Sequence, residues 1–164
     1  MSKNSPKEKE EHFEEKVLFV NRCSKVVKGG RKFSFSALIL VGDGQGRVGY
    51  GFAKANELTD AIKKGGESAR KSLMSFATTV EGSIPHEILV NCDGAKLLLK
   101  PALPGTGVVA GSRVRSILEL AGIKDIVAKS LGSNNPINQV KATFKALAGL
   151  TSKENILKER KSDD

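Results

Sequence analysis

Residues 34–54 read SFSALILVGDGQGRVGYGFAK, and this stretch decides the fold of the N-terminal half of the chain. It contains two runs rich in β-branched and aromatic residues, 34–41 and 47–54, joined by a glycine-rich turn, and a similar run lies upstream at 16–27. Such runs separated by glycine turns are typical of antiparallel strands. From 57 to 76 the apolar residues recur instead at three- and four-residue steps, which predicts an amphipathic helix lying on the sheet.

The rest of the chain predicts a second unit, which begins after a stretch with Gly82 and Pro85. Asn135 before Pro136 has the pattern of an N-cap followed by proline at the first helical position. The expected elements are strands at 87–91 and 95–100, a helix ending at Gly122, a strand at 126–131 and a final helix. The predicted fold class is α+β, with two small α/β units of β-β-β-α and β-β-α-β-α order. The expected domains are 16–78 and 79–150, between a flexible charged arm (1–15) and a flexible charged tail (151–164).

The net charge favours a polyanionic partner. The 164 residues hold 27 Lys and Arg against 18 Asp and Glu, a formal charge of +9. Residues 17–76 carry +7 of that charge, from eleven Lys and Arg against four Asp and Glu. Nucleic acid or an anionic membrane surface leads the candidates. Aromatic residues make up 5% of the chain and Trp is absent, so contacts to the backbone and shape of folded RNA fit better than stacking as the main binding mode.

Several other classes of function are not indicated. Cys23 and Cys92 lie far apart without spaced His or Cys partners, so neither a zinc site nor a disulfide framework is expected, and a reducing cytoplasm is the simplest location. His12 and His86 have no evident partner for acid–base catalysis. The first sixteen residues lack the apolar run of a secretory signal, and no segment approaches transmembrane length.

A first glycine loop, Lys28-Gly29-Gly30-Arg31-Lys32, lies between the first two predicted strands. Paired glycines there most often mean only a hairpin turn. Here, however, five cations lie within eleven residues around a bare tip, which can press its N–H groups against phosphates or enter an RNA groove. We therefore favour RNA binding. The residues predicted to bind RNA are Arg22, Lys25, Lys28, Gly29, Gly30, Arg31, Lys32, Arg47, Lys54, Lys63 and Lys64.

A second glycine loop contains G-x-G-x-x-G at 44–49, the spacing of a dinucleotide-binding fingerprint. That fingerprint must open a helix whose N-terminus receives the pyrophosphate, whereas here a strand follows. The strand alternates bulky residues with Gly49 and Gly51, so that one of its faces is bare. Close contact with another part of the backbone and close approach of RNA explain this bare face equally well.

A third glycine loop, 104–112, runs directly into a helix that carries Arg113 and Arg115. A glycine-rich loop at a helix N-terminus is an anion site, and this one is loosely similar to the phosphate loop of galactokinase-type small-molecule kinases. Phosphoryl transfer, however, needs carboxylates that bind metal and position the nucleophile, and the second unit offers none in a recognisable motif. We interpret the loop as a surface that contacts an anion or a protein.

The sequence over roughly residues 14–150 closely resembles the bacterial ribosomal protein S5 family. The resemblance lies in VNRCSKVVKGGRKFSFSALILVGDGQGRVGYGFAKANEL and in LLLKPALPGTGVVAGSRVRSILELAGIKDIVAKSLGSNNPINQVKATFKAL. It implies an N-terminal unit like the double-stranded-RNA-binding fold. It also implies a C-terminal unit of the left-handed βαβ type that those kinases share, which explains the likeness of the phosphate loop without catalysis.

By the same resemblance, the first loop is expected to reach small-subunit rRNA near the helix where spectinomycin binds. The third loop and its helix, with Gly105, Gly107, Arg113 and Arg115, resemble the family surface that faces ribosomal protein S4 and affects decoding accuracy. The family also contacts protein S8 and helps line the tunnel through which mRNA enters. A structural constituent of the cytoplasmic small ribosomal subunit is therefore expected, supporting its assembly and translational accuracy, with no catalytic residues, metal, other cofactor, membrane contact or small-molecule substrate.

Two other functions compete with this expectation. A free double-stranded RNA binder, such as a regulator or a processing factor, would need only the N-terminal unit. A phosphotransferase would use the third loop and would require ATP and a divalent metal.

Overall fold

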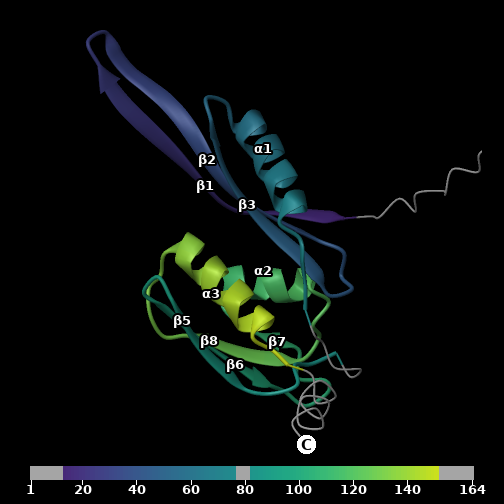
Figure 1. Ribbon diagram of the computed structural model, residues 1–164. Coiled ribbons are helices and arrows are strands. Elements are labelled where there is room, and N and C mark those ends of the chain that lie inside the picture. Colours follow the sequence, from purple (N-terminus) through teal and green to yellow (C-terminus); the bar gives the residue numbers. More distant parts are fainter. Residues whose placement is uncertain (1–12, 77–81, 152–164) are drawn as a thin grey trace, which may run out of the picture.

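The structure is a computed structural model that describes residues 13–76 and 82–151 (Figure 1). The described residues do not include 1–12 of the predicted arm, with His12, or 152–164 of the predicted tail. The predicted order of the N-terminal unit is confirmed. Its strands β1 (Glu14–Val27), β2 (Gly30–Gly42) and β3 (Arg47–Ala55) form an antiparallel sheet, and α1 (Leu58–Lys71) follows.

The helix of this unit ends earlier than its apolar period predicted. Instead of continuing to residue 76, α1 ends at Lys71, and Met74–Ser75 form a short strand, β4, beside β3. The Ser72 hydroxyl donates to the carbonyl oxygen of Tyr50 at 2.7 Å, which ties the end of the helix to the sheet. Met74 is consequently 43% exposed, whereas Phe76 is buried.

The C-terminal unit contains β5 (Ile88–Cys92), β6 (Ala95–Pro101), β7 (Val108–Val109), α2 (Ser112–Leu120), β8 (Ile126–Ser130) and α3 (Pro136–Ala148). Its strand order is β5-β6-β8-β7, and β7 is parallel to β8. The sequence did not predict β7, which has only two residues within the third glycine loop. The predicted cap is confirmed, because the Asn135 side chain accepts a hydrogen bond from the N–H of Ile137 at 3.1 Å.

The centre of the N-terminal sheet, formed by the second half of β2 and the start of β3, is buried on both faces. Ala37, Ile39 and Val41 of β2 lie against α1, together with its residues Ala61 and Ala69. The alternate residues of the sheet belong to a larger core that includes side chains of α2 and α3 (Leu38, Leu40, Val48, Val114, Ile117, Leu118, Val140, Phe144, Leu147). Four layers result, α1, the first sheet, the α2–α3 pair and the second sheet (Figure 1). The two units therefore share one core.

Two glycines of β3 allow α1 to approach the sheet closely. A Cβ atom on Gly51 would overlap the carbonyl oxygen of Gly65, and one on Gly49 would overlap that of Ala69. Both carbonyls belong to the helix backbone, which cannot move aside without losing its hydrogen bonds. The bare face of this strand, for which the sequence left two explanations, is therefore in close contact with a helix backbone.

The second glycine loop joins the two units. The N–H groups of Gly44 and Gly46 each donate at 3.0 Å, to the carbonyl oxygens of Leu120 and Ala121 at the end of α2. The last carbonyls of a helix lack partners within the helix, so the loop satisfies two of them. A Cβ atom on Gly122 would overlap the carbonyl oxygen of Gly44, which leaves no room for a larger residue.

Replacing Gly51 with alanine tests this contact between α1 and the sheet. We expect Gly51→Ala to lower the free energy of unfolding by about 3 kcal/mol, because the new methyl group forces the sheet and α1 apart. Urea denaturation followed by circular dichroism measures the change. Gly29→Ala is the matched control, since its Cβ atom meets nothing within 4 Å, and it should change the unfolding free energy by less than about 0.5 kcal/mol. Equal stability of the two variants would contradict the prediction.

Candidate nucleic-acid interface

The C-terminal half of β1 and the N-terminal half of β2 form a long hairpin that projects from the body of the molecule (Figure 1). The strands pair without interruption from Phe19 opposite Leu38 to Val27 opposite Gly30, so that Lys28 and Gly29 form a two-residue turn. Gly30 has φ 137°, a backbone conformation that favours glycine. The tip is bare, because Cβ atoms on Gly29 and Gly30 would have no neighbour within 4 Å.

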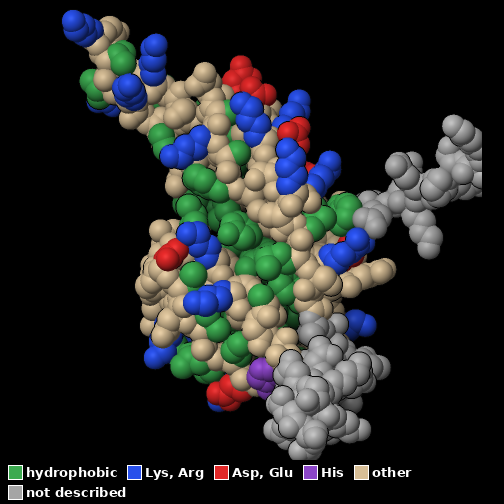
Figure 2. Space-filling view, in the orientation of Figure 1, with side chains coloured by type: hydrophobic (Ala, Val, Ile, Leu, Met, Phe, Trp, Pro, Cys, Tyr) green, Lys and Arg blue, Asp and Glu red, His purple; other side chains and the backbone are tan. Residues whose placement is uncertain are grey.

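The cations predicted to bind RNA gather on this hairpin. Arg22, Lys25, Lys28, Arg31 and Lys32 are all exposed, and none of them forms an ion pair with the described residues. From 16 to 42 the chain has six Lys and Arg and no Asp or Glu. Figure 2 shows Lys and Arg side chains at the tip and along the hairpin. The result is a projecting arm of one charge sign, which suits a polyanion.

The remaining predicted cations occupy the body of the N-terminal unit. Lys63 and Lys64 are exposed on α1, and the Lys54 ammonium lies 5.8 Å from the centre of the Phe52 ring on β3. Acidic residues also lie on α1, so its surface is mixed in charge (Figure 2). The hairpin is therefore the stronger part of the predicted interface.

The third glycine loop is held by a buried carboxylate. Gly105 and Gly107 have φ of 89° and 77°, and the N–H of Gly107 donates to Asp125 Oδ1 at 2.8 Å. Thr106 is fixed as well, since both its N–H and its hydroxyl donate to the carbonyl oxygen of Leu103. These bonds direct the chain into β7 and then into α2.

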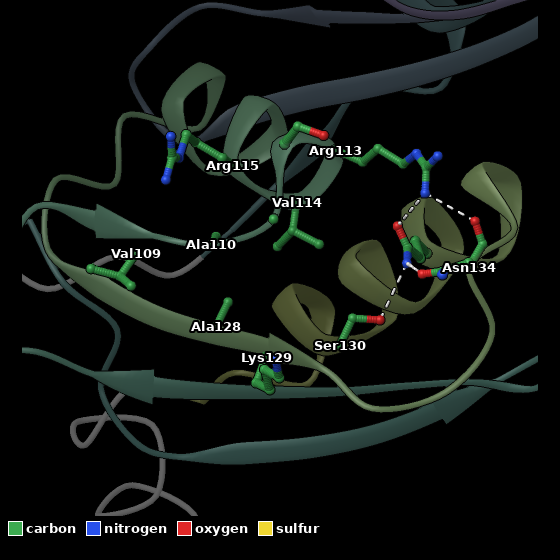
Figure 3. Close-up of a pocket in the computed structure, with 12 residues that line it drawn as sticks. Val109, Ala110, Arg113, Val114, Arg115, Ala128, Lys129, Ser130 and Asn134 are labelled. Atoms are coloured by element: carbon green, nitrogen blue, oxygen red, sulfur yellow. Dashed lines mark hydrogen bonds between the residues drawn. The ribbon is translucent and has the colours of Figure 1, made fainter.

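Beside this loop, a cavity of roughly 430 Å³ lies between the start of α2 and β8 (Figure 3). The two predicted arginines point away from each other there. Arg113 donates from Nη1 to the carbonyl oxygen of Asn134 at 2.9 Å and to Gln139 Oε1 at 3.1 Å, so that it fastens α2 to the start of α3. The Arg115 side chain is exposed and makes no hydrogen bond or ion pair within the part of the chain that the structure describes. Only Arg115 is thus placed to meet a partner.

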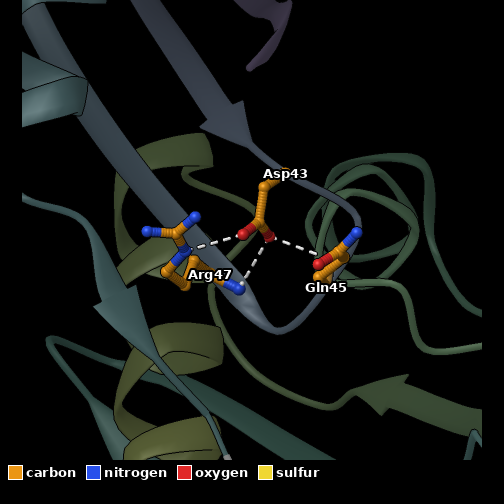
Figure 4. Close-up of polar contacts among 3 residues, drawn as sticks. All are labelled: Asp43, Gln45 and Arg47. Atoms are coloured by element: carbon orange, nitrogen blue, oxygen red, sulfur yellow. Dashed lines mark hydrogen bonds and ion pairs between the residues drawn. The ribbon is translucent and has the colours of Figure 1, made fainter. Parts of the chain in front are cut away.

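Arg47 lies apart from the hairpin cations, at the start of β3 beside the turn that joins it to β2 (Figure 4). Its Nε donates to Asp43 Oδ2 at 2.7 Å, while Asp43 Oδ1 accepts from the N–H groups of Gln45 and Arg47. Burial acts to raise the pKa of Asp43, but these hydrogen bonds and the Arg47 charge outweigh it and hold the pKa below its ordinary value. Arg47 shapes the loop that joins the units, and the structure does not bring it together with the other predicted RNA-binding residues.

Sequence reasoning missed Phe33 in this interface. The side chain is 45% exposed on the hairpin, and the guanidinium carbon of Arg22 lies 4.5 Å from the centre of its ring. In β2, Phe33 and Phe35 alternate with serines, which places both rings on one face of the strand. This alternation could have indicated an aromatic face on the hairpin.

Two other features bear on function. None of the helices in residues 13–76 and 82–151 is long and apolar enough to cross a membrane. Within the same residues no three His, Cys, Asp or Glu side chains group in a way that could hold a metal ion.

Known proteins match almost the whole chain. Residues 13–77 match the family described as ribosomal protein S5, N-terminal domain, and residues 90–160 match ribosomal protein S5, C-terminal domain. Small ribosomal subunit protein uS5 of Chlamydia pneumoniae is 74% identical over 158 residues, covering 96% of this chain and 94% of the relative. The same protein of Chlamydia abortus is 73% identical, covering 98% and 96%. That of Protochlamydia amoebophila is 67% identical, covering 98% and 99%.

The contacts of Asp43 predict an acid-sensitive contribution to stability. A carboxyl whose pKa is lower in the folded state stabilises the fold above its unfolded pKa of about 3.9, and the contribution disappears as the pH falls through the folded value. Asp43→Asn should therefore lower the unfolding free energy at pH 7 by about 1 kcal/mol. The difference from the wild-type chain should shrink below about pH 4. Denaturant titrations of both chains at several pH values measure this difference in unfolding free energy. A difference that does not vary with pH would contradict the prediction.

Proposed function

The chain belongs to the ribosomal protein S5 family, and from this we propose that it is a structural constituent of the small ribosomal subunit that docks on rRNA through its β1–β2 hairpin. It would act in the cytoplasm as part of the assembled ribosome. The observation that carries the proposal is the charge of the projecting hairpin, which has five exposed cations and no acid between 19 and 38. Phosphates of rRNA are the polyanion that a component of this particle meets.

We also propose that the third glycine loop and the start of α2 face a neighbouring ribosomal protein, S4 by the family resemblance. Arg115 is the residue available for that contact, because Arg113 is already bonded to Asn134 and Gln139. If the contact differs between the open and closed states of the subunit, its energy shifts the equilibrium between them and so affects decoding accuracy. From the family resemblance alone, we further propose that the chain contacts S8 and helps line the tunnel through which mRNA enters.

The phosphotransferase alternative has less physical support. A phosphate loop binds its ligand through free backbone N–H groups. In the third loop, the N–H of Gly107 already donates to the carboxylate of Asp125, and the N–H of Thr106 donates to Leu103. A carboxylate 2.8 Å from the N–H of Gly107 would also repel a phosphate at that position. The relatives are ribosomal proteins, which are not enzymes.

Sedimentation separates assembly into the ribosome from free RNA binding. A tagged chain, expressed in bacteria that lack their own copy, should migrate with the small subunit on a sucrose gradient and remain there after a wash at high salt. A free double-stranded RNA binder would instead dissociate at moderate salt and migrate near the top of the gradient. That second result would contradict the proposal.

Neutralising the hairpin tip should weaken the salt dependence of RNA binding. Replacing Lys28, Arg31 and Lys32 with Gln should lower the slope of log affinity against log salt concentration, by about 0.7–0.9 for each phosphate that the variant no longer neutralises. The control replaces three exposed lysines of the C-terminal unit, Lys96, Lys124 and Lys129, which removes the same charge. Filter binding to small-subunit rRNA over a range of salt concentrations measures both slopes. If the two triple variants have equal slopes, the tip is not a site of phosphate contacts.

Loss of the exposed arginine on α2 should affect accuracy rather than folding. Arg115→Leu removes a cation that can pair across the interface, while the buried side chains of α2 stay in place. Assembled ribosomes that carry it should misread near-cognate codons several-fold more often, since about 1.4 kcal/mol of differential contact energy corresponds to a tenfold shift. Arg113→Leu is the contrasting variant, which should lower stability and assembly by removing two hydrogen bonds. Reporter assays of stop-codon readthrough, run beside subunit profiles, measure these effects. Wild-type accuracy in fully assembled Arg115→Leu ribosomes would refute the role of this residue.

A further inference from the structure

The two faces of the projecting hairpin differ in chemistry. Residues paired across antiparallel strands point to the same side of the sheet. On one face, Val26 pairs with Arg31, and Phe33 lies next to them along β2 with Arg22 over its ring. On the other face, Lys25 pairs with Lys32 and no aromatic side chain is present near the tip. One face therefore carries an exposed aromatic ring among its cations, and the other carries cations without an aromatic ring.

The apolar side chains of the first face are open to solvent. Phe33 is 45% exposed and Val26 is 76% exposed, and neither belongs to the core. Figure 2 shows hydrophobic side chains between Lys and Arg side chains on the hairpin. Cations and N–H groups contact phosphates, and an exposed ring adds nothing to those contacts directly. The ring therefore points to a ligand with an apolar face as well as a negative charge.

We propose that Phe33, backed by the guanidinium of Arg22, is a stacking site for an unpaired nucleobase. The inference rests on the proposed RNA-binding function and adds to it a specific ligand group. Each nucleobase has a π face that can stack on an aromatic ring, and a guanidinium beside the ring strengthens the contact. Bases inside a duplex are already stacked on one another, so the base must come from a bulge, a loop or an end. The hairpin would thus recognise a helix that carries an unpaired nucleotide.

The low aromatic content of the chain is compatible with a single stacked base. General affinity still comes from the cations, and the ring adds selectivity for RNA with a base outside the stack. The competing explanation is structural, namely that Phe33 stabilises the hairpin by packing against Arg22 and its cross-strand neighbour Ser24. The two explanations differ in whether removal of the ring affects all RNA equally.

Binding to two RNA probes separates these explanations. One probe is a paired duplex, and the other is the same duplex with one unpaired adenosine at its centre. For the full chain, Phe33→Leu should weaken binding to the bulged duplex at least about fivefold and leave the paired duplex unchanged. Phe33→Tyr, which keeps the ring, should bind both probes like the wild-type chain. The salt dependence should not change in either variant, because every cation of the hairpin stays in place.

Phe52 provides a matched control. This ring is 42% exposed and also has a lysine nearby, with Lys54 at 5.8 Å, but it lies on β3 in the body of the molecule. Phe52→Leu should leave binding to both probes unchanged. A direct readout comes from 2-aminopurine in place of the unpaired adenosine, whose fluorescence should fall when the wild-type chain binds and should fall much less with Phe33→Leu.

Three outcomes would overturn the inference. If Phe33→Leu binds both probes as the wild-type chain does, the ring contacts no base. If Phe33→Leu loses affinity equally for both probes, the ring acts by stabilising the hairpin. If the wild-type chain binds neither probe, the proposed RNA binding by the hairpin fails, and the stacking site fails with it.

Discussion

Burial of the centre of the N-terminal sheet on both of its faces is the constraint on which the rest of the structure depends. One face lies against α1 and the other against α2 and α3, so a single layer of strands contributes to both hydrophobic clusters. The close approach of α1 is possible only because Gly49 and Gly51 have no side chains. A sheet fixed in this way is a firm base for the extension of β1 and β2 beyond it, where no core supports the hairpin. The arm is thus anchored by contacts made well below its tip.

The same constraint fixes the two proposed contact surfaces, the hairpin and the start of α2, relative to each other. The end of α2 is bonded to the second glycine loop through Gly44 and Gly46, and its start carries Arg115 beside the third loop. An ion pair between Lys16 of β1 and Glu119 of α2, 3.0 Å apart, adds a further link. This pair is exposed and contributes little stability, so the backbone bonds and the shared core carry the connection. The sheet that carries the hairpin is therefore connected to α2 through packed and bonded atoms.

Local patterns in the sequence were sufficient to predict most elements. The features that were not predicted depend mainly on contacts between residues far apart in the chain. The Asn135 cap and the strand runs depend on neighbours a few residues away, and these predictions are confirmed. The early end of α1 depends on the carbonyl oxygen of Tyr50, twenty-two residues from Ser72. Arg113 is hydrogen-bonded and the Arg115 side chain is not, because Arg113 meets Asn134 and Gln139 of a later segment. Phe33 was overlooked because composition argued against stacking for the chain as a whole, whereas the exposure of one ring is a property of its position.

The three glycine loops show why a glycine motif alone does not identify a function. All three contain glycine at close spacing, and two of them resemble nucleotide or phosphate loops in sequence. What distinguishes them is the partner of each backbone N–H and the charge around each loop. At Gly44 and Gly46 the N–H groups bond to the end of α2, and at Gly107 the N–H bonds to Asp125, so neither loop offers these groups to a phosphate. Space around the glycines does not distinguish the hairpin turn, because a Cβ atom on Gly105 or Gly107 would also meet nothing within 4 Å, as on Gly29. The hairpin turn differs in charge, since five cations lie between 22 and 32 and no acidic residue lies between 16 and 42. A bare tip surrounded by positive charge alone is suited to close contact with RNA.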